Sequence, residues 1–254
     1  DIKKYHKEKN IIIVCSGAIA LGSSLLKTKN IRKLEDKQAA ASIGQIELAH
    51  QWKQHLKIHK IDIAQILITL EDSEIRRRYL NARKTINTLL QNKVIPVINE
   101  NDTVATEEIR YGDNDRLAAR VAQIVEADLL LLLTDVKGFF NKNPKHHEDA
   151  KLVEKVSKID SKIYKMASSQ TNSLGSGGMF TKIQAAEIAG SYGCNTLIFQ
   201  GNIVNPLKNL KKNDVGSLFI SSEKKKKGVK NWLAGSINIS GTLEIDNGAI
   251  DALK

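Results

Sequence analysis

The chain has 254 residues, of which 41% are hydrophobic, so it can bury the core of one large domain or two modest ones. No stretch reaches the roughly 18 unbroken apolar residues that cross a bilayer, and no signal-peptide pattern opens the sequence, so we expect a cytoplasmic protein without membrane contact. The formal charge of +11 suits anionic partners in general, but the densest lysine run, residues 224–227, is more typical of a solvated connector than of a binding surface.

Apolar runs and helix-like segments alternate along the chain. In chain order, the predicted elements are a strand at 11–14, a helix at 36–55, a strand at 63–69, a helix at 76–91, strands at 94–98 and 129–133, a helix at 183–189 and a strand at 195–200. This alternation predicts an α/β protein, a three-layer α/β/α sandwich around a mainly parallel sheet.

Ligands of such sheets bind at the carboxyl ends of the strands, so the residues directly after each strand are the candidates for a site. Ser16, Gly17 and Ala18 follow the first strand and precede helix-like sequence, where backbone amides and a hydroxyl can face an anion. The alternative is an ordinary N-cap serine with a tight turn, which this tripeptide alone favours.

Acidic and amide side chains follow the strand at 94–98. They form two groups, Asn99-Glu100-Asn101-Asp102 and Gly112-Asp113-Asn114-Asp115. Either group alone is what a surface loop uses to close turns. Together they suit a magnesium-nucleotide, a substrate ammonium group or the alignment of catalytic lysines.

A glycine-rich segment, residues 175–182, leads into the helix predicted at 183–189. Glycines let a backbone approach phosphate closely, the helix N-terminus supplies N–H donors, and Lys182 adds a positive charge, which are the elements that phosphoryl transfer needs. A plain glycine-rich turn is the alternative. The P-loop and protein-kinase signatures are absent from the sequence, which excludes those two classes.

Two further sequences carry less information. Thr134 and Asp135 end the strand at 129–133 and suit either nucleotide binding or the capping of a turn. His146 and His147 lie in a charged stretch without metal-ligand spacing, so we expect no metal site built from protein ligands.

Six motifs, in order, resemble the glutamate 5-kinases of the amino acid kinase family over about residues 1–221. They are V-C-S-G-A-I-A, A-A-S-I-G-Q, V-I-P-V-I-N-E-N-D, Y-G-D-N-D-R-L-A-A, L-L-L-L-T-D-V-K-G and L-G-S-G-G-M-F-T-K. The resemblance implies the amino acid kinase fold and the use of ATP and Mg²⁺ to convert L-glutamate to γ-glutamyl phosphate, the first step of proline biosynthesis. It also implies a homo-oligomer, a dimer or tetramer, with proline as a candidate feedback inhibitor.

The same resemblance assigns roles to individual residues. The substrate residues are Ser16, Asp102 and Asn114, with Asn99, Glu100 and Asp113 in the same loop. The nucleotide residues are Thr134, Asp135, Ser176, Gly177, Gly178, Met179, Phe180, Thr181 and Lys182. Lys182 is expected to stabilise charge on the transferred phosphoryl group, and Asp115 to orient the catalytic lysines.

The resemblance also divides the chain. We expect a kinase domain at residues 1–222, a lysine-rich linker at 223–230 and the start of a β-rich PUA domain at 231–254. The family's first strand, which carries a second lysine before a Gly-Ser or Gly-Thr turn, has no counterpart here, so we expect the chain to be part of a longer protein.

Two alternatives remain open at this stage. One is another enzyme of the same fold, an acetylglutamate, aspartate or UMP kinase. The other is a non-catalytic RNA-binding protein that uses its PUA domain and positive charge. The lysine run lacks interleaved aromatic residues for base stacking, so nucleic acid is not the expected partner.

Overall fold

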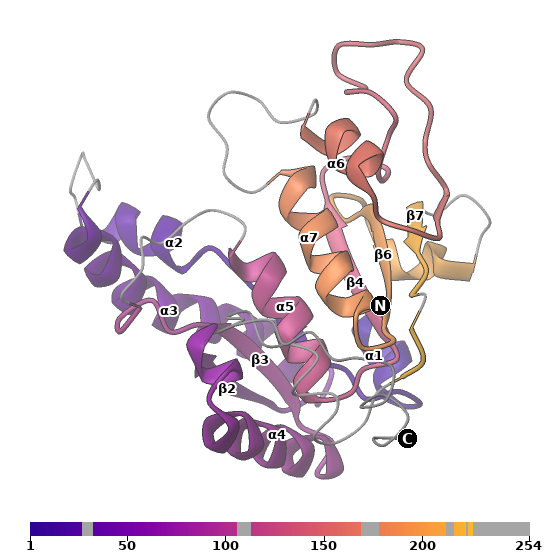
Figure 1. Cartoon of the computed structure of the whole chain (residues 1–254). Coiled ribbons are helices and arrows are strands. Elements are labelled where there is room, and N and C mark those ends of the chain that lie inside the picture. Colours follow the sequence, from indigo (N-terminus) through magenta and orange to yellow (C-terminus); the bar gives the residue numbers. More distant parts are fainter. Residues whose placement is uncertain (27–32, 106–112, 169–177, 212–215, 222, 226–254) are drawn as a thin grey trace, which may run out of the picture.

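The computed structural model describes residues 1–26, 33–105, 113–168, 178–211, 216–221 and 223–225 (Figure 1). The helices are α1 Ile2–His6, α2 Ala18–Leu25, α3 Leu34–Lys57, α4 Arg76–Gln91, α5 Asp113–Ile124, α6 Ser161–Ser168 and α7 Met179–Gly190, with 3-10 turns at Glu71–Ser73 and Pro206–Lys211. The strands are β1 Ile13–Val14, β2 Ile63–Ile68, β3 Ile95–Glu100, β4 Leu129–Thr134, β5 Lys155–Val156, β6 Asn195–Gln200 and β7 Gly216–Phe219.

The predicted α/β class is confirmed, and the described strands hydrogen-bond in two groups. The first group has the order β1-β3-β2 and is wholly parallel. The second has the order β4-β6-β7-β5, in which only β6 and β7 are antiparallel. Strands β5 and β7 were not predicted, since each has four residues or fewer and lacks a long apolar run.

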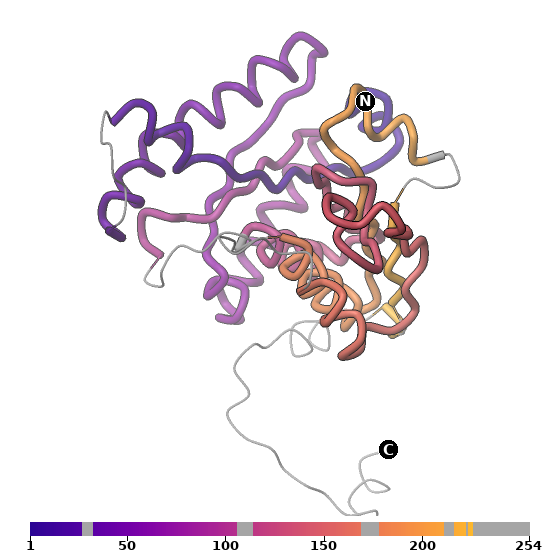
Figure 2. Tube along the Cα trace, turned by 90° about the horizontal axis from the view of Figure 1, so that it is seen from above, coloured from indigo at the N-terminus to yellow at the C-terminus, as the bar shows by residue number. Residues whose placement is uncertain are grey.

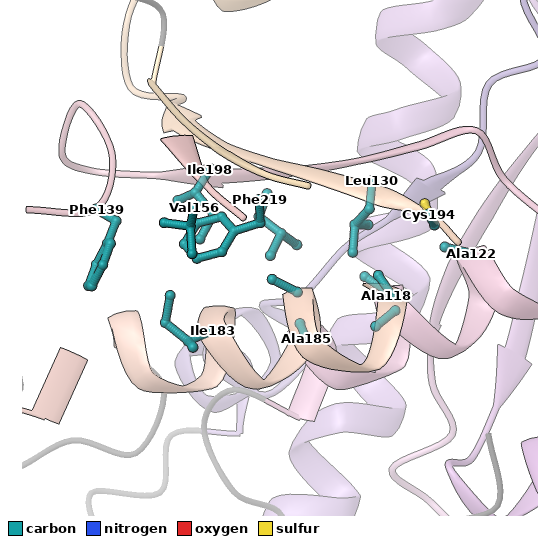
Figure 3. Packing of buried hydrophobic residues seen from close by; sticks show 14 of the residues in the cluster. Ala118, Ala122, Leu130, Phe139, Val156, Ile183, Ala185, Cys194, Ile198 and Phe219 are labelled. Atoms are coloured by element: carbon teal, nitrogen blue, oxygen red, sulfur yellow. The ribbon is translucent and has the colours of Figure 1, made fainter. Parts of the chain in front are cut away.

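Helix α5 packs against both groups of strands and contributes to two hydrophobic cores. Its residues Leu117 and Val121 lie in the core that includes Ile98 of β3, whereas Ala118 and Ala122 lie in the core that includes Leu130 of β4. In Figure 1 the helix runs between the two halves, and Figure 3 shows Ala118 and Ala122 near Leu130. The same helix therefore has one buried face in each half of the molecule.

Helices α2 and α3 cross with their backbones in contact. A Cβ atom at Gly22 would lie 1.7 Å from the carbonyl oxygen of Ala40, and one at Gly44 would lie 1.8 Å from that of Ala18. Only glycine permits so close an approach. The crossing fixes α2, and hence the turn that precedes it, relative to α3.

The N-terminus and the start of the predicted linker both contact the predicted kinase domain. The side chain of Asp1 accepts hydrogen bonds from the backbone amides of Leu207 and Lys208, which places the N-terminus beside the 3-10 turn at Pro206–Lys211 (Figure 2). In the predicted linker, Lys225 pairs with Asp128 at 2.6 Å, so its first residues contact the kinase domain. The predicted PUA segment, 231–254, lies outside the described residues.

Within the described ranges, no helix combines the length and the apolar character that a membrane span requires.

Candidate active site

The ends of β1 and β3 lie side by side, since Val14 pairs with Ile98 and the amide of Cys15 donates to the carbonyl oxygen of Ile98. Directly after β1, Ser16 is exposed and Gly17 adopts a φ of +106°, a conformation that favours glycine. Gly17 is also the N-cap position of α2. The predicted serine therefore lies at a strand end and immediately before a helix, as its sequence context indicates.

The strand β3 extends two residues beyond the predicted 94–98, to Glu100, and its last residues and the two that follow are largely buried. Asn99 is 2% exposed and Asp102 is 8% exposed, while Glu100 and Asn101 are half-buried. The Asn99 side-chain amide donates to Oε1 of Gln45, on α3, over 2.7 Å. These burial values separate the segment from an ordinary surface turn, whose polar side chains remain in water.

Two amide oxygens at this edge lack a hydrogen-bond partner among the residues that the structure describes. They are Oδ1 of Asn99 and Oδ1 of Asn114, and both atoms are buried. A buried acceptor without a donor costs free energy, so such atoms point to a ligand or solvent donor. Asn114 lies in the first turn of α5, and Asp113 is the residue at which that helix begins.

Asp115 joins the N-terminal ends of α5 and α7. Its carboxylate accepts a hydrogen bond from the Thr181 hydroxyl at 2.7 Å and lies 3.0 Å and 3.2 Å from the ammonium nitrogen of Lys182. The side chains of Lys182 and Asp115 are only 13% and 17% exposed. The structure thus brings together the two residues that the sequence predicted to act together in catalysis.

The N-terminal end of α7 can hold an anion. Gly178 is its N-cap residue, and Met179, Phe180 and Thr181 form the first turn, where backbone N–H groups lack helical partners. The Phe180 ring packs against the ring of Tyr164 on α6 at 5.4 Å between centroids. The predicted residues Ser176 and Gly177 lie outside the described residues.

Thr134 is the last residue of β4 and Asp135 follows it, where the sequence predicts nucleotide binding. The Thr134 hydroxyl donates to the Asp135 carboxylate at 3.3 Å, and the Lys145 ammonium lies 3.2 Å from the same carboxylate. The hydrogen bond from Lys145 lowers the pKa of Asp135 below its ordinary value. Both partners are largely exposed, so a ligand can exchange with Lys145 at little cost.

Sequence reasoning did not assign two contacts at this site. The first contact is between Gln45 and Asn99. Gln45 is the last residue of the A-A-S-I-G-Q motif, which supported the family resemblance but was assigned no role. Arg116 donates through Nε and Nη2 to Oε1 of Gln184 and so ties α5 to α7 two residues after Lys182. No sequence signal links Arg116 to Gln184, because they are 68 positions apart.

Comparisons with known proteins show the family of the chain. Residues 1–200 match the family model described as "Amino acid kinase family". The chain is 50% identical over its whole length to "Glutamate 5-kinase" of Bradyrhizobium diazoefficiens, covering 69% of that protein, and 50% identical to "Glutamate 5-kinase" of Rhodopseudomonas palustris, covering 68%.

Solved structures show the same fold. Isopentenyl phosphate kinase of T. acidophilum aligns with a TM-score of 0.53 at 14% identity, over 86% of this chain and 89% of that one. Uridylate kinase of Archaeoglobus fulgidus gives 0.55 at 16% identity, over 86% and 88%. The predicted amino acid kinase fold is therefore confirmed. The chain belongs to the amino acid kinase family and, within it, to the glutamate 5-kinases.

Proposed function

We propose that the protein transfers a phosphoryl group from ATP to the side-chain carboxylate of L-glutamate, which yields γ-glutamyl phosphate and ADP in the first step of proline biosynthesis. The observation that carries the proposal is the Asp115–Lys182 pair, which holds a largely buried ammonium group at the N-terminal ends of two helices. The relatives' name, glutamate 5-kinase, supplies the acceptor.

The chemistry needs charge stabilisation more than proton removal. A glutamate side chain has a pKa of about 4.3, so the attacking carboxylate is already ionised near neutral pH. Two anions must nevertheless approach each other. Lys182 would act as a catalytic residue by offsetting charge on the oxygens of the transferred phosphoryl group, and Asp115 would orient it.

On the glutamate side, the proposal uses the ends of β1 and β3 and the start of α5. Asp102, Asn99 and Asn114 supply buried oxygen acceptors, and Ser16 supplies an exposed hydroxyl beside backbone amides. Glutamate offers one cationic ammonium group and two carboxylates, so a site needs both kinds of partner. The remaining proposed residues of this group are Glu100 and Asp113.

On the nucleotide side, the proposal uses the ends of β4 and the start of α7. Thr134 and Asp135 would bind nucleotide at the strand end, and the amides of residues 176–181 would receive phosphate oxygens. Through its contact with Asp115, Lys182 would act between this group and the glutamate group.

Mg²⁺ would bind at this site together with the phosphates of the nucleotide. Mg²⁺ in kinases is usually held by one or two carboxylates together with substrate phosphates, and the described residues hold no cluster of three metal-binding side chains. When bound, the ion would neutralise charge on the phosphates.

The test is a coupled assay of ADP release with glutamate, paired with hydroxylamine trapping of the acyl phosphate as a hydroxamate. We expect both signals to require glutamate and ATP together. Acetylglutamate, aspartate and UMP are offered in parallel at equal concentration. Faster turnover of any of these three than of glutamate would overturn the proposed acceptor.

We also propose that the protein is a cytoplasmic homo-oligomer inhibited by proline, and that residues 223–230 link the kinase domain to a PUA domain. Membership of a biosynthetic kinase family supports the inhibition by proline, since the end product of a pathway is a natural inhibitor of its first enzyme. Light scattering of the protein and proline titration of its glutamate turnover test the first two. A single-subunit mass and proline-insensitive turnover would contradict them.

A further inference from the structure

One face of α3 contacts the end of β3 and the segment that follows it at three points. Gln38 Nε2 donates to the carbonyl oxygen of Ala105 at 3.0 Å, the hydroxyls of Ser42 and Thr103 lie 3.0 Å apart, and Gln45 accepts from Asn99 at 2.7 Å. Positions 38, 42 and 45 share a helix face. Along α3, the partners come in reverse chain order, so the helix lies antiparallel to this segment. Helix α3 therefore positions the whole proposed glutamate segment and not one residue of it.

The Gln45 contact also sets the orientation of the Asn99 side chain. An asparagine amide has a donor end and an acceptor end. Gln45 uses an oxygen to accept from Nδ2 of Asn99, which leaves Oδ1 as the remaining acceptor. That oxygen is buried and has no partner within the described part of the chain. Rotating the amide would place an NH₂ group there instead and would set two oxygens against each other at Gln45.

Glutamate can satisfy this acceptor in one way only. At neutral pH both carboxylates of glutamate are ionised and accept hydrogen bonds, so its α-ammonium group is its only donor. A buried carbonyl oxygen gains most from a charged donor. The orientation of the Asn99 amide is therefore matched to the ammonium end of the substrate.

We infer that Gln45 is a positioning residue for glutamate: by holding the Asn99 amide, it presents the Asn99 carbonyl oxygen to the α-ammonium group of the substrate. The inference rests on the proposed function, and it gives a role to the end of the A-A-S-I-G-Q motif. It concerns binding of the amino group, which is remote from the carboxylate that accepts phosphate. Gln45 therefore acts on substrate affinity and selectivity, not on the phosphoryl-transfer step.

The test compares Gln45→Met with Gln45→Glu. Methionine keeps the length and unbranched shape of the side chain but loses the strong acceptor, whereas glutamate keeps an acceptor for Nδ2 of Asn99. Gln51→Met is the matched control, since Gln51 lies on the same helix, is exposed and donates to the side chain of Glu47. Melting curves accompany each variant.

We expect Gln45→Met to raise the Kd and KM for glutamate about tenfold, with kcat and the KM for ATP unchanged, because one hydrogen bond to a charged group is weakened. Gln45→Glu should stay within about threefold of the wild type. Glutarate, which lacks the amino group, supplies a second readout. The preference for glutamate over glutarate, in kcat/KM, should fall about tenfold in Gln45→Met and remain unchanged in Gln51→Met.

Calorimetry of glutamate binding without ATP separates the two ideas. A wild-type protein that binds glutamate but never phosphorylates it would overturn the proposed function, and the Gln45 comparison would still be made by Kd. An unchanged Kd in Gln45→Met, or an equal loss with glutamate and glutarate, would overturn the inference. Equal losses in Gln45→Met and Gln45→Glu would do the same, since the second variant retains the acceptor.

Discussion

Replacing Lys182 by methionine removes one positive charge while keeping an unbranched side chain in the first turns of α7. In the structure the ammonium group lies 3.0 Å and 3.2 Å from the two oxygens of Asp115. If Lys182 stabilises charge that develops on the transferred phosphoryl oxygens, its loss should affect the transition state more than the bound substrates.

Two magnitudes follow from the geometry. Loss of a single charge-stabilising donor typically lowers kcat by about 10²–10³-fold, so we expect a fall in that range with the KM for glutamate nearly unchanged. Stability should also decrease, because Asp115 is mostly buried and, among the described residues, would keep the Thr181 hydroxyl as its hydrogen-bond donor. Exposed ion pairs contribute about 0–1 kcal/mol to stability, and breaking a buried pair costs about 3–5 kcal/mol. For this partly buried pair we expect the free energy of unfolding to fall by about 1–3 kcal/mol.

The assay measures kcat and KM by ADP release, with melting temperatures recorded for each protein. Lys142→Met is the matched control, because Lys142 also contacts a carboxylate, that of Asp149, but both side chains are well exposed. The control should retain wild-type kcat and melting temperature. A folded Lys182→Met enzyme with near-normal kcat, or one that loses affinity for glutamate instead, would refute the proposed role of Lys182.

Three further predictions address packing, thiols and binding. Gly44→Ala should destabilise the protein by more than about 3 kcal/mol in thermal melts, because its Cβ would overlap a backbone oxygen of α2, whereas Gly190→Ala, with its nearest neighbour at 4.0 Å, should be neutral. Burial raises the pKa values of Cys15 and Cys194 to about 11, so both thiols should alkylate with iodoacetamide far more slowly at pH 8 than in the unfolded chain. The thiols of the unfolded chain ionise at lower pH than those of the folded protein. Their contribution to the free energy of unfolding is therefore present below pH 9 and is lost as the pH rises toward 11. Fast native alkylation would contradict this. Asp102→Ala should raise the Kd for glutamate about tenfold or more in calorimetry, and an unchanged Kd would remove Asp102 from the site.

The sequence predicted the elements whose signal lies within a few residues. Strand β6 and helix α4 have the predicted bounds, because each is a continuous run with one clear periodicity. Strand β5 has two residues and owes its conformation to pairing with β7, so no local pattern announces it.

The candidate site divides in the same way. Asp115 and Lys182 were predicted as partners from a family resemblance, and the structure places them in contact across 67 positions. The Gln45–Asn99 bond was not predicted, since it depends on how α3 crosses the end of β3. Polar contacts between distant segments follow from tertiary packing, which residue spacing does not encode.

Helix α5 belongs to both hydrophobic cores. Its first residues include Asn114 of the proposed glutamate group and Asp115, which contacts Lys182 of the proposed nucleotide group. A ligand that fixes the packing on one face of this helix therefore also fixes the position of the residues near the other ligand. We therefore expect the affinities for glutamate and nucleotide to depend on each other. By thermodynamic reciprocity, the factor by which one ligand changes the Kd of the other must be the same in both directions.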